Sequence, residues 1–360
     1  MRTSKRFTSL AVVAALGLLA AACGSDDKSS SDTAAAPTTT AASTDTQPAG
    51  TTPASSDVTA GVAFDTGGRG DGTFNDSAAR GLDQAVSELG VKKIELEATK
   101  DEDRKTNLEL LATQNANPII GVGFLFTDPM TEVAAAHPDT TFGIVDSVVD
   151  LPNVRSLVFA EEQGSFLVGA AAALKSESGH IGFIGGQEID LIKKFEAGYI
   201  AGAKAVNPDI VVDSKYLGPA GDNSAWGNVA GAKEIAKGWY DAGADVIYTA
   251  AGGSGAGTIQ AAVEADKWAI GVDSDQYLTA SADEQKHILT SMLKRVDVAV
   301  FQTIKAVADG DTKGGVIVFD LKVDGVGYAT SGGFVDDIKD KLDAYKADIV
   351  SGKIVVPTKP

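Results

Sequence analysis

The chain has 360 residues, with 49 acidic and 31 basic side chains and a formal net charge of −18 at pH 7. Because proteins neutralise nucleic-acid phosphates with clusters of Lys and Arg, this balance argues against a nucleic acid as a partner. A single Cys excludes an internal disulfide, and three scattered His argue against a zinc site or a histidine-based catalytic centre. We therefore expect neither a metal nor a cofactor.

The N-terminus has the three parts of a secretory signal. Three basic residues lie within the first six, residues 10–22 are apolar, and small residues precede Cys23. The apolar stretch is too short to span a bilayer as a helix. Its end resembles a bacterial lipoprotein signal, in which the Cys thiol receives lipid chains such as palmitate and becomes the new N-terminus. The alternative is an ordinary signal peptide with a chance cysteine.

We expect residues 1–22 to be the signal peptide and residues 23–57 to be a disordered tether. The tether consists mainly of Ser, Thr, Ala, Pro and Asp, so it cannot bury enough apolar surface to offset the entropy of ordering. A lipid on Cys23 would hold the folded body on the extracytoplasmic face of the cell membrane, with the tether as a flexible spacer.

From Val58 the pattern changes to alternating strands and helices. The first half is predicted to have strands at 58–64, 93–97, 118–124 and 141–145, and helices at 73–89, 104–114 and 128–136. After a break near 153–159, strands are predicted at 180–184, 210–216, 246–249 and 268–272, and helices at 161–175, 189–206, 228–242 and 255–265. The tail adds a helix at 296–308, a pair of strands near 316–323 and 327–329, and a helix at 334–351.

This alternation predicts an α/β fold with two doubly wound parallel-sheet lobes. About 300 residues follow the tether, which is enough for two domains. Two such lobes bind ligand between them, at the carboxyl ends of their strands. The informative side chains are therefore the ones that come directly after strands.

Several polar and aromatic residues occupy such positions. Asp146 and Asp273 each follow an apolar strand, and Lys294 begins a later helix. Phe74 follows the first glycine-rich loop, and Tyr248 lies in a strand that ends in a second one. For Phe74 and Tyr248 the alternative is packing in the core, and for Lys294 it is simple exposure to solvent.

The combination points to binding rather than catalysis. Paired carboxylates accept hydrogen bonds from a vicinal diol, and aromatic faces suit a flat base or the apolar face of a sugar. Two Asp residues could in principle do the acid–base work of a glycosidase, but the sequence has no nucleophile–base arrangement that favours this. We therefore expect that the protein is not an enzyme.

Ten segments together resemble one known family, the basic membrane protein (BMP) or purine nucleoside receptor lipoproteins. These are the substrate-binding subunits of ABC importers. The segments follow the family's order, at residues 73–75, 121–124, 142–146, 162–169, 181–186, 195–199, 243–247, 251–255, 271–276 and 290–294. The resemblance implies the type I periplasmic-binding-protein fold, with three crossovers near Phe159, Leu289 and Gly314. The N-terminal lobe is then 58–158 plus 289–313, and the C-terminal lobe is 159–288 plus 314–360.

The resemblance also implies ligand-binding residues. Two aromatic rings, matching Phe74 and Tyr248, sandwich the base, and a set of charged residues binds the ribose. The full set implied by the matching positions is Asp65 and Asn75 at the base, Asp146, Asp273 and Lys294 at the ribose, and the Gly252-Gly253 turn beside it. The chain departs from the family in a first loop that carries Arg69 and Asp71, and in the loop 218–226, where Trp226 is a candidate further aromatic.

The expected function follows from this resemblance. The protein would be a monomeric, lipid-anchored receptor that binds a nucleoside, in this family a purine, and delivers it to the permease and ATPase subunits of an importer. Alternatives of the same fold are a sugar- or autoinducer-binding protein and a ligand sensor that docks on a signalling receptor.

Overall fold

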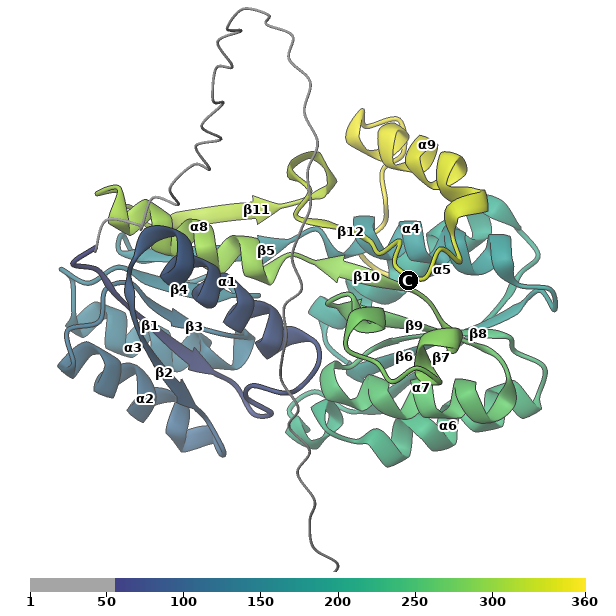
Figure 1. Cartoon of the computed structure of the whole chain (residues 1–360), viewed down its shortest axis with the longest axis horizontal. Helices are drawn as coiled ribbons and strands as arrows, with labels where there is room; N and C mark the ends of the chain where they lie inside the picture. The colour runs from purple at the N-terminus through teal and green to yellow at the C-terminus, as the bar shows by residue number, and fades with distance from the viewer. Residues whose placement is uncertain (1–55) are drawn as a thin grey trace, which may run out of the picture. The chain divides into compact units, whose positions relative to one another are not determined.

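A computed structural model describes residues 56–360, which belong to one compact unit of the chain. The expected signal peptide, Cys23 and nearly all of the expected tether lie outside the described residues. Within the described range, strands and helices alternate in two α/β lobes, each built on a six-stranded sheet (Figure 1). The predicted fold class is therefore confirmed.

The first lobe has an entirely parallel sheet with the strand order β11-β5-β4-β3-β1-β2. Its strands are β1 (Thr59–Phe64), β2 (Lys92–Glu97), β3 (Ile119–Gly121), β4 (Phe142–Val145), β5 (Val154–Phe159) and β11 (Gly315–Phe319). One face is covered by α1 (Phe74–Leu89) and α8 (Val296–Ala308), and the other by α2 (Asp101–Thr113) and α3 (Thr127–Ala136). Val62 packs with the first pair of helices and Ala63 with the second, because neighbouring strand residues point to opposite faces.

The second lobe repeats this plan with the order β12-β10-β9-β8-β6-β7, and β12 is antiparallel to β10. Its strands are β6 (His180–Gln187), β7 (Val211–Gly218), β8 (Val246–Ala250), β9 (Trp268–Asp273), β10 (Ile288–Lys294) and β12 (Val326–Tyr328). The helices are α4 (Glu161–Lys175), α5 (Asp190–Val206), α6 (Val229–Asp241), α7 (Gly255–Ala265) and α9 (Lys339–Val350). Buried side chains of α4, α5 and α9 pack in one cluster, and those of α6 and α7 in another.

The chain passes between the sheets three times: after β5, between β10 and α8, and between β11 and β12. The first crossover follows Phe159, the last residue of β5. The expected boundaries at Leu289 and Gly314 fall too early. Leu289 lies within β10, which pairs with β9 in the second lobe, and Gly314 precedes β11, which pairs with β5 in the first lobe. An apolar strand fits either sheet equally well, so its composition does not tell which lobe it joins.

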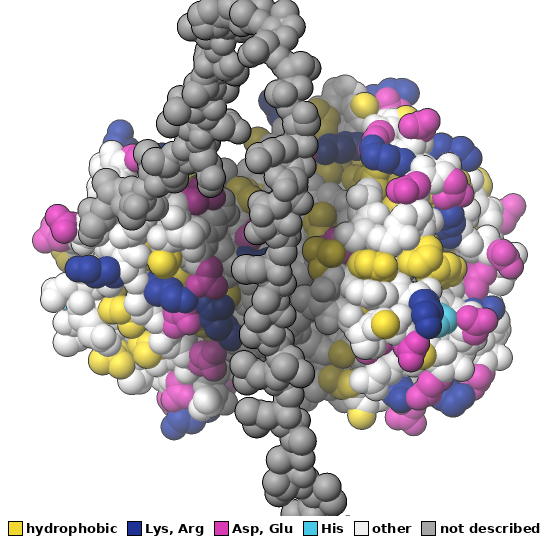
Figure 2. Space-filling view, viewed as in Figure 1, with side chains coloured by type: hydrophobic (Ala, Val, Ile, Leu, Met, Phe, Trp, Pro, Cys, Tyr) yellow, Lys and Arg dark blue, Asp and Glu magenta, His cyan; other side chains and the backbone are white. Residues whose placement is uncertain are grey.

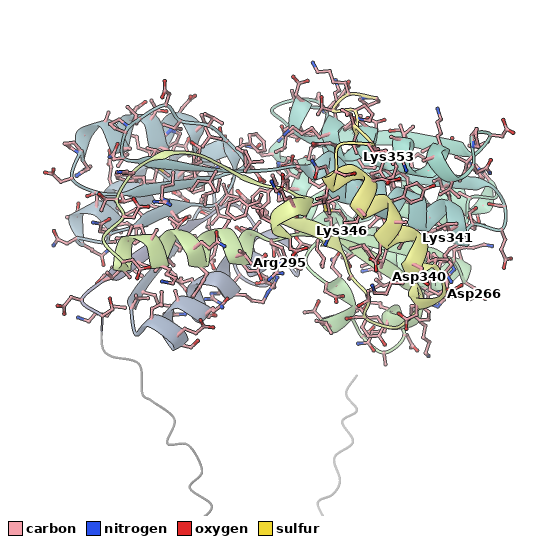
Figure 3. All side chains as sticks on the ribbon, turned by 90° about the horizontal axis from the view of Figure 1, so that it is seen from above. Asp266, Arg295, Asp340, Lys341, Lys346 and Lys353 are labelled. Carbon is pink, nitrogen blue, oxygen red and sulfur yellow. The ribbon has the colours of Figure 1, made fainter. Side chains whose placement is uncertain are left out.

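The same pairing corrects the expected pair of strands in the tail. β11 and β12 belong to different sheets and do not pair with each other. The segment between them is the third crossover. Figure 3 shows Arg295 at the second crossover, where α8 begins, and Asp340 and Lys341 on the outward side of α9. Among residues 56–360, no helix has both the length and the apolar character that crossing a membrane requires.

Helices α4 and α5 are in backbone contact through glycines. A Cβ atom at Gly202 would lie 1.9 Å from the carbonyl oxygen of Phe166, and one at Gly169 would lie 2.1 Å from that of Tyr199. Only Gly allows the two helices to approach so closely, which explains its presence inside two helices despite its low helix propensity. Helix α5, which packs closely on α4 in this way, also contributes side chains to the cavity described below.

Candidate ligand-binding site

A cavity of about 250 Å³ lies between the lobes, at the carboxyl ends of the strands. Its wall is largely apolar, with a few charged groups, and this is the usual character of a small-molecule site. Nine of the ten predicted ligand-binding residues line it, namely Asp65, Phe74, Asn75, Asp146, Trp226, Gly252, Gly253, Asp273 and Lys294. The structure thus brings together residues that are up to 229 positions apart in the chain.

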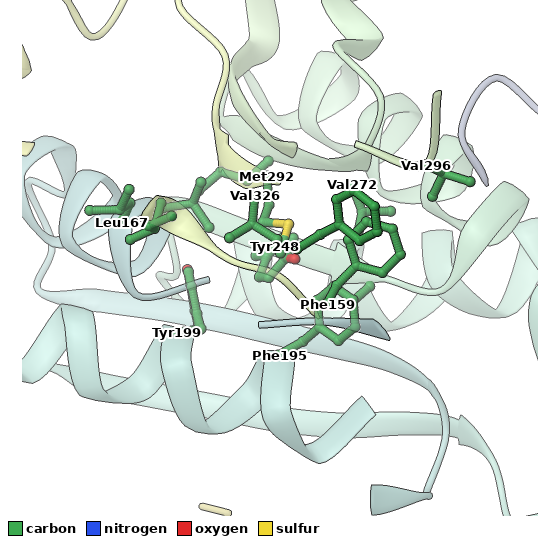
Figure 4. Packing of buried hydrophobic residues seen from close by; sticks show 14 of the residues in the cluster. Phe159, Leu167, Phe195, Tyr199, Tyr248, Val272, Met292, Val296 and Val326 are labelled. Carbon is green, nitrogen blue, oxygen red and sulfur yellow. The ribbon is translucent and has the colours of Figure 1, made fainter. Parts of the chain in front are cut away.

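Tyr248 is the exception. Its side chain is fully buried in β8, where the ring packs 5.3 Å from Tyr199 and 5.6 Å from Phe183 between ring centroids. Figure 4 shows Tyr248 among the buried hydrophobic side chains of a core cluster that includes residues of both lobes. The strand reaches the cavity only at its last residue, Ala250, and Ala251 directly after it also lines the cavity. The expectation that Tyr248 faces the ligand is therefore corrected in favour of core packing.

Phe195 is the cavity aromatic that sequence reasoning missed. It lies on α5, and Leu191 and Ile192 from the preceding turn line the cavity with it. Spacing by three and four residues places these side chains on one helix face. That spacing was visible in the sequence, but nothing in it showed that this face of the helix borders the ligand rather than the core.

The cavity has aromatic rings from both lobes around one cation. The Lys294 Nζ lies 4.7 Å from the ring centroid of Phe74 in the first lobe and 5.6 Å from that of Phe195 in the second. Trp226 of the second lobe meets Phe124 of the first edge-on, with centroids 6.1 Å apart. Flat apolar surfaces therefore border the cavity on both sides of the charged group.

The charged group is a buried cluster centred on Lys294. Its Nζ lies 2.6 Å from Asp146 Oδ2 and 3.7 Å from Asp273 Oδ1, and the three side chains are 3%, 5% and 8% exposed. The other oxygen of Asp146, Oδ1, is buried and has no hydrogen-bond partner among the described residues, and the same holds for Oδ1 of Asp273. Each carboxylate thus has one acceptor atom available to a ligand.

Burial and the charges within the cluster together shift the pKa values of its members. It raises the pKa of Asp273 to about 6, and the nearby Lys294 opposes the rise. Burial likewise raises the pKa of Glu161, at the start of α4, to about 7. Burial disfavours the charged form of Lys294, but the carboxylates of Asp146, Asp273 and Glu161 outweigh it and raise the pKa of the ammonium group. Lys294 is thus a permanent cation in the cavity wall.

Both aspartates have strained backbone conformations. Asp146 has a φ of 64° and Asp273 a φ of 63°, each directly at the end of a strand. Asp tolerates this left-handed region better than most residues, but the region is still unfavourable for any side chain with a Cβ. Such strain is typical of residues whose side chains must point in one particular direction at a functional site.

The first loop is held together by its own charged residues. Asp71 accepts hydrogen bonds from the backbone N–H groups of Thr73, Asn75 and Asp76 and from the side chain of Asn75. The Asn75 Oδ1 in turn accepts from the N–H of Asp65 at 3.2 Å. Asp71, a departure from the family pattern, thus positions the two polar residues that were predicted to face the base.

Arg69, the other departure, does not line the cavity. Its guanidinium forms two 3.1 Å hydrogen bonds with Asp83 and further ones with Glu95, at the outer surface. Figure 2 shows acidic and basic side chains interspersed on the described part of both lobes. Among residues 56–360, no group of three or more His, Cys, Asp or Glu side chains is arranged to hold a metal ion.

The sequence model of the PnrA-like ABC transporter substrate-binding proteins matches residues 58–359. The chain belongs to this family. A nucleoside-binding ABC transporter protein, BmpA, of Lactococcus lactis is 37% identical over 84% of this chain and 90% of its own length. Basic membrane protein A1 of Borrelia garinii is 30% identical over 80% of this chain and 85% of its own length. The family that the sequence resembles is thereby confirmed.

Solved structures agree with this family assignment. A solute-binding protein of an ABC transporter system from Aeropyrum pernix has a TM-score of 0.70 and 28% identity, covering 83% of this chain and 94% of its own. A 5-methylthioribose-binding protein from Thermotoga lettingae has a TM-score of 0.56 at 14% identity, which shows a shared fold only. The fold is that of the periplasmic solute-binding proteins, and the family's role is to bind a transported substrate rather than to catalyse a reaction.

Proposed function

We propose that the protein binds a nucleoside, preferably a purine nucleoside, in the cavity between its lobes. The observation that carries the proposal is a pair of buried carboxylate oxygens beside Lys294, Oδ1 of Asp146 and Oδ1 of Asp273, which accept no hydrogen bond from the described residues. A ribose presents two neighbouring hydroxyl groups, and each can donate to one carboxylate while Lys294 donates to a hydroxyl oxygen. Phe74 and Phe195 provide apolar faces for the base.

The polar residues of the first loop favour a nucleoside over a simple sugar. Arg104 and Thr66 use Oδ1 of Asp65, and none of the hydrogen bonds among residues 56–360 uses its Oδ2. This oxygen can accept an N–H from the edge of a base. The name of the Lactococcus lactis relative, a nucleoside-binding protein, supports the same ligand class. The preference for a purine rests on the family resemblance.

We test the ligand class by isothermal titration calorimetry with guanosine, adenosine, uridine, the free bases and ribose. We expect nucleosides to bind and purine nucleosides to bind most tightly. Asp273→Asn should weaken nucleoside binding by about 2–3 kcal/mol, because it removes a buried charge-assisted hydrogen bond. Asp309→Asn, at the exposed end of α8, is the matched control. Binding of ribose or another sugar alone would refute the proposal in favour of a sugar receptor.

We further propose that the receptor is lipid-anchored through Cys23 and hands its ligand to a permease and its ATPase. The lipoprotein-type signal supports the anchor, and so does a relative from Pyrococcus abyssi, 36% identical over 75% of this chain, that is named a lipoprotein. Anchoring keeps the receptor near its permease and raises its effective concentration there. Cys23→Ala should release the protein from the membrane fraction with nucleoside affinity unchanged. Retention of the variant on the membrane would contradict this role of Cys23.

A further inference from the structure

A continuous series of polar contacts leads from the cavity to the opposite lobe. Arg104, whose side chain is 3% exposed, lies between two carboxylates of the first lobe. Its Nε and Nη2 donate to Asp65 Oδ1 at 2.9 and 2.6 Å, and its Nη1 donates to Asp101 Oδ1 at 2.7 Å. Asp65 lines the cavity, whereas Asp101 is 71% exposed at the start of α2. One guanidinium thus connects a cavity carboxylate with a rim carboxylate.

The rim carboxylate meets the second lobe. Asn223 Nδ2 donates to Asp101 Oδ1 at 3.1 Å, across the gap between the lobes. Asn223 belongs to the loop 218–227, which follows β7 and which we call the rim loop. The bond to Arg104 lowers the pKa of Asp101, so the group that Asn223 contacts is ionised at neutral pH.

The second lobe fixes the orientation of the Asn223 amide. Gln187, 1% exposed at the end of β6, donates from Nε2 to Asn223 Oδ1 at 2.9 Å. The Oε1 of Gln187 accepts from the N–H of Gly221 in the same loop, also at 2.9 Å. Because Oδ1 of Asn223 is already an acceptor for Gln187, its NH₂ group must face Asp101. The donor is therefore preset before the lobes meet.

The rim loop also contributes to the cavity. Trp226 lines the cavity and packs edge-on against Phe124 of the first lobe. It rests on Gly186, where an added Cβ would lie 2.3 Å from the indole. The loop that bears Asn223 therefore also carries a cavity residue, and its contacts through Asn223 and Trp226 to the first lobe require the two lobes to lie together.

We propose that Asp101, Arg104 and Asn223 form an interlobe latch that responds to the occupancy of the cavity through Asp65. A ligand bound to the free oxygen of Asp65 holds this carboxylate in place, Asp65 holds Arg104, and Arg104 presents Asp101 to Asn223. Because the last bond forms only in the closed state, it favours closure and slows release of the ligand. Arg104 is a positioning residue in this scheme and does not itself touch the ligand.

The first test measures the association and dissociation rates of guanosine by stopped flow. Its use of guanosine rests on the proposed nucleoside-binding function. Asn223→Asp keeps the acceptor for Gln187 but places a second carboxylate against Asp101. We expect dissociation about three- to tenfold faster with an unchanged association rate. A double variant that also carries Asp101→Asn exchanges the carboxylate and the amide between the two positions. This variant should restore the wild-type dissociation rate. Asn207→Asp, at the end of α5, is the control for added charge.

Coupling to the cavity is tested with Arg104→Lys. A Lys offers one donor group and cannot bridge both carboxylates as the guanidinium does. If the latch acts through Arg104, Asn223→Asp should have little further effect on dissociation in the Arg104→Lys background. Fully additive effects would show that the Asn223 contact is independent of the cavity and would overturn the proposed coupling.

A second measurement does not depend on the identity of the ligand. The chain has three Trp residues, so Trp239→Phe and Trp268→Phe leave Trp226 as the only indole. Asn223→Asp should increase acrylamide quenching of Trp226 in the ligand-free protein, because opening exposes the ring. If guanosine does not bind to the wild type, the proposed nucleoside function fails and the quenching result alone decides the latch. Unchanged quenching together with unchanged dissociation would overturn it.

Discussion

Replacing Lys294 by Met should destabilise the fold strongly, and the geometry gives the magnitude. The ammonium lies 2.6 Å from Asp146 and 3.7 Å from Asp273, with all three side chains nearly inaccessible to water. Met preserves the length of the side chain but leaves the carboxylates without a counter-charge. Removing one partner of a buried ion pair costs about 3–5 kcal/mol, chiefly because the remaining charge is uncompensated. We expect the free energy of unfolding to fall by that amount.

Differential scanning calorimetry measures this loss. For roughly 300 folded residues, an unfolding entropy of about 2 cal/mol/K per residue converts about 3–5 kcal/mol into a Tm lowered by about 5–8 °C. Lys305→Met is the matched control, because Lys305 pairs with Asp309 on the exposed side of α8, with 47% and 60% of the side chains exposed. An exposed pair contributes less than about 1 kcal/mol, so this control should change the Tm by less than about 2 °C.

A double variant and the pH dependence test the cause. Asp146→Asn removes the carboxylate charge nearest to the lost ammonium and tolerates the φ of 64°, so adding it to Lys294→Met should recover part of the lost stability. Asp273 and Glu161 already have pKa values raised to about 6 and 7, and loss of the cation raises them further. The folded variant then binds more protons than the unfolded chain, so its deficit should be smaller at pH 5 than at pH 8. A deficit equal to that of Lys305→Met, or one independent of pH, would refute this reasoning.

Three further predictions concern binding and packing. Nucleoside affinity should fall as the pH drops below about 6, because the Asp273 carboxylate, whose pKa is about 6, takes up a proton and is then no longer a charged acceptor. Calorimetric titration at pH 8 and pH 5 measures this change, and equal affinities would contradict the prediction. Gly202→Ala should lower the stability by about 1–3 kcal/mol through overpacking, whereas Gly238→Ala, on the open side of α6, should raise it by about 0.5–1 kcal/mol; thermal unfolding distinguishes the two. Tyr248→Phe should leave nucleoside affinity unchanged in the same titrations, whereas Phe195→Ala should weaken it at least tenfold. A larger loss of affinity in Tyr248→Phe than in Phe195→Ala would show instead that Tyr248 contacts the ligand.

The sequence was sufficient for the alternation of strands and helices but not for their assignment to lobes. Apolar runs such as the one in β10 indicate burial on both faces, and two parallel sheets offer the same environment. The lobe that receives β10 or β11 depends on which neighbouring strand is accessible after each crossover. That choice is a property of the whole chain, so the predicted boundaries at Leu289 and Gly314 missed the observed ones.

The site was predictable where backbone position alone decides it. Asp146 and Asp273 end strands, and all parallel strands of a doubly wound sheet end at the cavity edge. Tyr248 and Phe195 could not be separated in this way, because each lies within an element, where the side-chain direction depends on the packing around it. The latch contacts were equally invisible, since Asp101 and Asn223 are 122 positions apart and meet only across the gap between the lobes.

The backbone at Asp273 brings stability and ligand binding into conflict. A neutral Asn, or a Gly, would satisfy the φ of 63° with less strain and would remove a carboxylate whose burial is unfavourable, while Lys294 would keep Asp146 as its partner. A library selected only for heat resistance should therefore replace Asp273 early. In natural lineages, loss of this Asp from an otherwise intact fold would mark descendants that have given up the ligand and kept the scaffold.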